Sequence, residues 1–127
     1  MHAPGISKQA EFSTQEAILK QLYEAFNTRK LDSLLAALDP AVDWPNGWEG
    51  GRLYGREAVR DYWTRQWAEL DPHVTPVAFT TDAEGRITVE VHAVIRDLNA
   101  KILADHTVLH RYTFEAGLIR RMEICQP

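Results

Sequence analysis

The first half of the chain places its apolar residues at the spacing of helices. One apolar stripe follows the sequence Ser13-Thr14-Gln15-Glu16, which has the form of a helix capping box. Its members are Ile18, Leu19, Leu22, Tyr23 and Phe26. This spacing predicts a helix from about Thr14 to Asn27. Residues 1–11 carry no period and are predicted to form a flexible N-terminal tail.

A second short helix is predicted after residue 30. Its apolar face is formed by four leucines, Leu31, Leu34, Leu35 and Leu38. Asp39-Pro40 should end it, because the residue before a proline is pushed out of the α region. Val42 to Trp44 is then a brief extended segment, and residues 46–55 form a loop in which Gly50-Gly51 suits a small hairpin.

A third helix is predicted to begin at Gly55 or Arg56 and to end before Asp71-Pro72. Its charged residues fall mostly on one side. The other side carries Val59, Tyr62, Trp63, Gln66, Trp67 and Leu70.

After Pro72 the period of the apolar residues changes from that of helices to that of strands, which is two. Four strands are predicted, at 74–81, 87–96, 102–114 and 118–125. Pro76 indicates that the first is an edge strand or contains a bulge, since proline cannot donate a hydrogen bond to a neighbour. One face of the third carries Ala104, His106, Val108, His110, Tyr112 and Phe114.

Helices followed by hairpin-joined strands are typical of the α+β class. We expect three N-terminal helices packed on one face of a strongly curved, mainly antiparallel sheet. Strands of this length must twist and coil, and a concave sheet covered by helices leaves room for a pocket. Residues 12–127 are predicted to form one domain.

Composition narrows the classes of function. The net charge of −4 and the lack of a basic stripe argue against nucleic-acid binding. The single cysteine, Cys125, cannot form an internal disulfide. No apolar run approaches the roughly 20 residues that span a bilayer, and the N-terminus lacks the apolar core of a signal peptide. We therefore expect a cytoplasmic protein that binds neither nucleic acid nor membrane.

All four tryptophans lie between Asp43 and Trp67, around a loop rich in proline and glycine. Buried tryptophans bring a large apolar surface and an indole N–H that needs a partner. The stretch is predicted to form the aromatic wall of a pocket, with a flexible entrance. Trp48 lies in the loop itself, where it either closes over a ligand or makes a dimer contact.

Three segments, in this order and spacing, resemble the nuclear transport factor 2-like superfamily, and SnoaL-like proteins in particular. They are LYEAFNTRKLDSLLAALDPAVDW, GREAVRDYW and HRYTFEAGLIRRMEI. The superfamily includes ketosteroid isomerases, SnoaL-like polyketide cyclases and scytalone dehydratases. The resemblance implies a cone-shaped α+β barrel with a pocket between sheet and helices. It also implies chemistry without a cofactor or metal, and a homodimer formed through the outer face of the sheet.

The resemblance suggests roles for individual residues. Tyr23 matches the tyrosine that donates a hydrogen bond to the oxyanion in ketosteroid isomerases. Trp44 replaces their proton-shuttling aspartate, with Asp43 one place earlier, and Trp63 replaces a supporting tyrosine. His110 stands near the position of their protonated aspartate. Because Trp44 cannot act as a base, we do not expect ketosteroid isomerase activity.

His110 is the first candidate for acid–base chemistry, with Tyr23 as a hydrogen-bond donor. The alternative is a core histidine bonded to a backbone carbonyl or to Tyr23. If adjacent strands bring His92 and His106 to the same face as His110, the three imidazoles suggest zinc. Their spacings match no metal-binding motif, so we predict no metal.

These features favour a small-molecule pocket protein of the SnoaL-like type. It would act as a cofactor-independent cyclase, isomerase or dehydratase on an apolar cyclic substrate. The residues predicted to line its pocket are Trp44, Trp48, Trp63, Trp67, His92, His106 and Met122. Two alternatives stay open: a non-catalytic binding protein for a hydrophobic metabolite, and a dimeric structural or interaction module.

Overall fold

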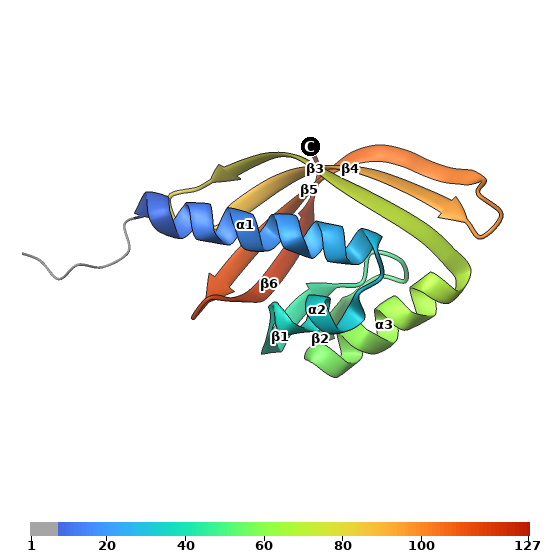
Figure 1. Ribbon diagram of the computed structural model, residues 1–127, viewed down its shortest axis with the longest axis horizontal. Coiled ribbons are helices and arrows are strands. Elements are labelled where there is room, and N and C mark those ends of the chain that lie inside the picture. Colours follow the sequence, from blue (N-terminus) through green and yellow to red (C-terminus); the bar gives the residue numbers. More distant parts are fainter. Residues whose placement is uncertain (1–7) are drawn as a thin grey trace, which may run out of the picture.

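The computed structural model describes residues 8–127, which form three helices and six strands (Figure 1). The helices are α1 (Lys8–Asn27), α2 (Leu31–Ala36) and α3 (Arg56–Glu69). The strands are β1 (Leu38–Pro45), β2 (Arg52–Tyr54), β3 (Leu70–Thr81), β4 (Ile87–Asp97), β5 (Ile102–Glu115) and β6 (Leu118–Cys125). The α+β class that the change of period predicts is confirmed.

The strands form one curved, open sheet in the order β2-β1-β6-β5-β4-β3. Within the described residues, β1 and β6 are the one parallel pair, and the other neighbours are antiparallel. The helices lie against the concave face of the sheet (Figure 1). The mainly antiparallel, strongly curved sheet covered by three helices is therefore as predicted.

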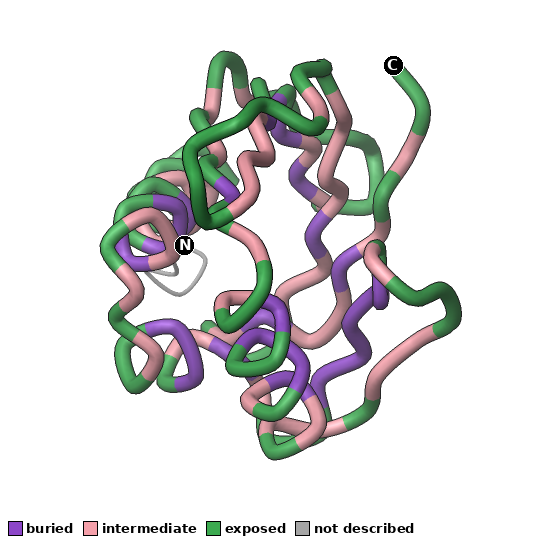
Figure 2. Tube along the Cα trace, turned by 90° about the vertical axis from the view of Figure 1, so that its right-hand side faces the viewer, coloured by how far each residue is buried: buried purple, intermediate pink, exposed green. Residues whose placement is uncertain are grey.

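Alternate residues of the strands form the core beneath the helices. On β4, Ile87, Val89 and Val91 have no exposed surface, and each buried side chain of this size contributes about 1.5–3 kcal/mol. The buried segments of helices and strands face the middle of the molecule (Figure 2). No helix within residues 8–127 has both the length and the apolar character to cross a membrane.

Helix α1 begins earlier than the capping box suggests. Lys8–Glu11, predicted to belong to the tail, are helical, and residues 1–7 lie outside the described residues. The hydroxyl of Thr14 donates to the carbonyl of Ala10 (3.0 Å) from within the helix instead of capping its end. Lysine, glutamine, alanine and glutamate all favour helices, so the helix continues backwards through these residues.

The end of the second helix differs from the prediction for a long-range reason. Leu38 was expected to complete that helix, but it begins β1, which continues through Asp39-Pro40. Leu38 lies beside Ile119 of β6 and is fully buried there. Local sequence carries no signal of this pairing, because the partner lies at the other end of the chain.

Strand β3 is an edge strand, and its register shifts just after Pro76, so both features that Pro76 indicated are confirmed. Asn27, the last residue of α1, ties this edge to the helix. Its amide nitrogen donates to the carbonyl of Val74 (2.7 Å), and its side-chain oxygen accepts from the N–H of Val74 (2.9 Å). Arg29 donates to the carbonyl of Pro72 (2.8 Å).

Candidate functional site

A cavity of about 270 Å³ lies between the concave face of the sheet and helices α1, α2 and α3. Most of its wall is apolar or aromatic, with contributions that include Leu22, Phe26, Trp44, Trp63 and Val108. This volume is near the lower end of the range of ligand pockets, which begins at about 300 Å³. The space therefore suits a small ligand.

The residues singled out in the sequence fall into two groups. Six line the cavity: Tyr23, Trp44, Trp63, His106, His110 and Met122. Three predicted pocket residues do not: Trp48, Trp67 and His92. The chemical roles assigned to the first group stay predictions.

Trp48 lies in a loop that is tied down by many hydrogen bonds. The side-chain oxygen of Asn46 accepts from the N–H of Trp48 (3.2 Å) and of Glu49 (2.7 Å), and Arg65 of α3 binds Glu49 (2.8 Å). Within the loop, the N–H of Asn46 donates to the carbonyl of Gly51 (3.0 Å), and the N–H of Gly50 donates to the carbonyl of Asn46 (2.8 Å). Trp48 itself packs partly buried against the core. These contacts give the loop around Trp48 a hydrogen-bonded backbone and join it to α3, and the flexible entrance that the glycines suggested stays a prediction.

Trp67 belongs to the predicted apolar face of α3 but lies beyond the cavity. Its ring stacks on Trp63, with centroids 6.1 Å apart, and the guanidinium of Arg29 lies 5.2 Å from its centre. Its Nε1 is the one buried side-chain nitrogen or oxygen in residues 8–127 without a hydrogen-bond partner. An apolar helix face covers a wide arc, and only part of that arc borders the cavity.

His92 points to the opposite face of the sheet from His106 and His110. It is half exposed, and its Nε2 lies 2.7 Å from the carboxylate of Asp105. The three imidazoles therefore do not converge. Residues 8–127 hold no group of three or more His, Cys, Asp or Glu side chains arranged for a metal ion.

The polar centre of the cavity wall is a chain of three side chains. The hydroxyl of Tyr23 lies 2.9 Å from Nδ1 of His110 and 2.8 Å from the hydroxyl of Tyr112. The rings of Tyr23 and His110 are nearly parallel, at 12°. Helix α1 supplies Tyr23, and His110 and Tyr112 are alternate residues of β5, so the period of two directs both towards the helix.

All three members of this chain are uncharged at neutral pH. Burial lowers the pKa of His110 to about 4, and no acidic side chain lies beside it to oppose this effect. Burial likewise raises the pKa of Tyr23 well above its ordinary value, and it raises that of Tyr112. The chain therefore works through neutral hydrogen bonds.

Gln66 is a polar residue of the site that sequence reasoning missed. It is 9% exposed and lines the cavity, yet its amide has no hydrogen bond to another described residue. Its place on the apolar face of the third helix was the available signal. A glutamine amide can both donate to a ligand and accept from it.

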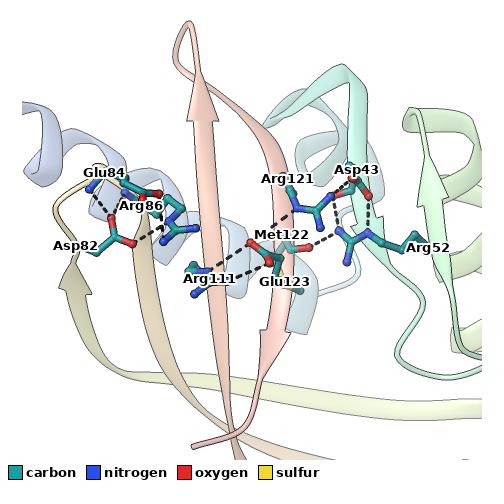
Figure 3. Close-up of polar contacts among 9 residues, drawn as sticks. All are labelled: Asp43, Arg52, Asp82, Glu84, Arg86, Arg111, Arg121, Met122 and Glu123. Atoms are coloured by element: carbon teal, nitrogen blue, oxygen red, sulfur yellow. Dashed lines mark hydrogen bonds and ion pairs between the residues drawn. The ribbon is translucent and has the colours of Figure 1, made fainter.

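No carboxylate among residues 8–127 lines the cavity. Asp43, which stands one place before Trp44, faces the other side of the sheet. There it accepts from Nε of Arg52 (2.5 Å) and from Arg121, and is 9% exposed (Figure 3). Trp44 takes the inward position because successive residues of a strand alternate in direction.

Residues 19–122 match the family model of the SnoaL-like domain. The chain belongs to this family. A search of curated proteins found no significant match. The match to the SnoaL-like family model covers most of the sequence, and it agrees with the resemblance that the three sequence segments suggested.

Solved structures agree in fold. An NTF2-like protein of unknown function from Burkholderia pseudomallei is 25% identical, with 90% of this chain and 91% of that one covered and a TM-score of 0.77. A putative polyketide cyclase from Xanthomonas campestris pv. campestris is 23% identical (93% and 91% covered, TM-score 0.76). An epoxide hydrolase/cyclase-like enzyme of pyran ring formation in the polyether salinomycin is 17% identical (91% and 92% covered, TM-score 0.76).

The cavity of this SnoaL-like domain combines an apolar wall with neutral hydrogen-bonding groups. Such a wall favours an apolar ligand, and the few polar groups fix its orientation. Imidazoles can in addition donate or accept a proton. The arrangement can therefore bind a small apolar molecule and polarise one of its polar atoms.

Proposed function

We propose that this SnoaL-like domain binds an apolar cyclic small molecule in its cavity and acts on it without a cofactor, as a cyclase, isomerase or dehydratase. The observation that supports this best is the hydrogen-bonded pair of Tyr23 and His110 in the wall of an otherwise apolar cavity. His110 would serve as acid, base or hydrogen-bond donor to the reacting group. The names of the similar polyketide cyclase and epoxide hydrolase/cyclase-like structures agree with this class of reaction.

A reaction of this class also needs a group that takes up a proton. With no carboxylate in the described cavity wall, His106 is our candidate. It is exposed, lies on the same face of β5 as His110, and has no hydrogen-bond partner within residues 8–127. Four residues along a strand separate the two backbone positions by about 13 Å, so both side chains must lean towards each other for one small ligand to contact both imidazoles.

The test uses a bicyclic ketone, 1-tetralone, in heavy water. Acid–base chemistry in the cavity should speed the exchange of its α-protons for deuterium, which proton NMR follows directly. His110→Phe should slow this exchange at least tenfold, since general acid–base groups contribute about 10²–10⁴. A smaller loss would contradict the catalytic role of His110.

His92→Phe is the matched control. It removes a histidine from the neighbouring strand but from the opposite face, where His92 contacts Asp105. Exchange should be unchanged in this variant. An equal loss in both variants would mean that the effect is not local to the cavity.

A non-catalytic binding protein is the second candidate, and the lack of a carboxylate in the described cavity wall favours it. In that case native mass spectrometry should reveal a small molecule that stays bound to the protein through purification. The protein should release this molecule without having changed it chemically. His110→Phe would then weaken retention, and no variant would alter α-proton exchange.

A further inference from the structure

The hydrogens of the Tyr112–Tyr23–His110 chain can be arranged in only a few ways. Two hydroxyl hydrogens and the single proton of a neutral imidazole must serve two contacts, one of 2.8 Å and one of 2.9 Å. The arrangement decides which ring nitrogen of His110 carries the proton. It thereby decides whether Nε2 acts as a donor or as an acceptor.

One arrangement uses both hydroxyl hydrogens within the protein. Tyr112 donates to the oxygen of Tyr23, and Tyr23 donates to Nδ1 of His110. The imidazole proton then lies on Nε2. No buried hydrogen is left without an acceptor, although Tyr112 is 1% exposed and Tyr23 is 3% exposed.

Both other arrangements place the imidazole proton on Nδ1 and leave a buried hydroxyl hydrogen unused. If Tyr23 accepts from His110 and donates to Tyr112, the hydrogen of Tyr112 has no acceptor, since its hydroxyl contacts Tyr23 alone among residues 8–127. If Tyr23 accepts from both neighbours, its own hydrogen has none. An unsatisfied buried donor costs the full desolvation of that group, so these arrangements are disfavoured.

Nε2 of His110 is the atom left for a ligand. It has no hydrogen-bond partner among the described residues, and it is not one of the buried atoms that lack a partner, so it keeps accessible surface. His110 is one of the residues that line the cavity, so the open space beside its ring is that of the cavity. Burial also lowers the pKa of His110, which keeps the ring neutral.

We infer that Tyr23, itself held by Tyr112, fixes His110 in the tautomer that carries its proton on Nε2, so that the cavity binds its ligand through an acceptor oxygen such as a carbonyl. Tyr23 is then a positioning residue, and His110 is the group that touches the ligand. The choice of ligand rests on the proposed function. The tautomer is a property of the free protein.

NMR of the ¹⁵N-labelled protein at neutral pH tests the tautomer directly. Long-range proton–nitrogen spectra distinguish a ring nitrogen that carries hydrogen from one that does not, and His110→Phe assigns the signals. We expect hydrogen on Nε2 and a bare, hydrogen-bonded Nδ1. Hydrogen on Nδ1, or on both nitrogens, would overturn the inference.

Two variants separate positioning from mere packing. Tyr23→Phe keeps the ring but removes the donor, so the Nδ1 signal of His110 should move towards that of a nitrogen without a hydrogen bond. Tyr112→Phe keeps the contact between Tyr23 and His110 and should leave the tautomer unchanged. If the Nδ1 signal is identical in Tyr23→Phe and in the unaltered protein, Tyr23 does not donate a hydrogen bond to Nδ1 of His110.

The ligand part is tested with 1-tetralone and its hydrocarbon analogue tetralin. A hydrogen bond from Nε2 should lower the infrared carbonyl frequency of bound 1-tetralone, and His110→Phe should reverse this shift. The variant should weaken 1-tetralone binding about three- to tenfold and leave tetralin binding unchanged. An unshifted carbonyl band, or an equal loss for both compounds, would contradict a carbonyl contact at His110.

The two proposals fail in different ways. If neither compound binds, the proposed apolar ligand site loses its support, and the NMR result still decides the tautomer. If both compounds bind but Nδ1 carries the hydrogen, the ligand site stands and the inference about His110 is wrong.

Discussion

The two faces of the same sheet use polar groups in opposite ways. On β5, His110 and Tyr112 face the cavity, whereas Arg111 between them faces outward and binds Glu123 of β6 (3.0 Å). The outer face continues this pattern across β6 and β1 to Asp43, Arg52 and Arg121 (Figure 3). The inner face holds neutral hydrogen bonds, and the outer face holds ion pairs.

This separation explains why equivalent residue types behave differently. His110 and His92 lie on neighbouring strands, but only His92 has a carboxylate beside it. Without a charged neighbour, burial alone decides the state of His110, and it remains neutral. The face of the sheet on which an imidazole lies therefore decides whether a carboxylate or neutral hydroxyl groups lie beside it.

The largest effect is expected from a charge placed on the inner face. Val91 is fully buried on β4, and Val91→Glu should destabilise the fold by about 4 kcal/mol or more, since it buries an unpaired carboxylate. Thr107→Glu adds the same charge to the exposed face of β5 and should change the free energy of unfolding by about 0.5 kcal/mol or less. Urea denaturation measures both, and similar losses would refute the distinction between the faces.

Acid should weaken the fold through His110. Its pKa is lowered from 6.5 to about 4, so between these values the unfolded chain binds a proton that the folded one does not. Stability should therefore fall as the pH is lowered from about 6.5 to 4, by up to about 3 kcal/mol from this group. Urea denaturation across this range should give a flatter profile for His110→Phe, and parallel profiles would contradict the assignment.

Removal of the buried carboxylate of Asp43 on the outer face should lower the free energy of unfolding by less than the two changes above. Asp43→Asn leaves Arg52 and Arg121 facing each other without their shared partner. Because both arginines keep part of their side chains in water, we expect a loss of about 2 kcal/mol, below that of a fully buried pair. Asp105→Asn, on an exposed pair, is the control and should change the melting temperature far less.

The smallest effect concerns Arg111 and Glu123. Both side chains are partly exposed, at 31% and 25%, so a double-mutant cycle should give a coupling of about 1 kcal/mol or less. The coupling should shrink as salt is added, because salt screens exposed charges. A coupling that is large and independent of salt would show that this face behaves like an interior.

Strand alternation was the most informative feature of the sequence. It predicted that His106, His110 and Tyr112 share a face. The same alternation on β4 directs His92 away from the face that Val91 and Ala93 share. The inclusion of His92 among the pocket residues went against this pattern. The contact between Tyr23 and His110 joins residues far apart in the chain, and it was anticipated only through the resemblance to known families.

Other features depended on contacts that local sequence does not encode. The glycines around Trp48 suggested mobility, but the side chain of Asn46 binds the backbone of that loop, and Arg65 of α3 binds its Glu49. The apolar face of α3 was predicted, yet periodicity cannot tell which part of a face borders an empty space, so Trp67 was misplaced. The homodimer through the outer face stays a prediction.

The edge of β3 carries a consequence for solubility. In the first half of β3, the N–H and C=O of Val74 point away from β4 and bind the side chain of Asn27. Because the direction of these groups alternates along a strand, the backbone of Pro72 and of Pro76, two residues away on either side, points outward as well. Proline has no N–H, and the N–H of Val74 is already bound. A strand from another molecule would find no donor at these three positions, so the contacts that hold α1 on the sheet also protect this edge from intermolecular aggregation.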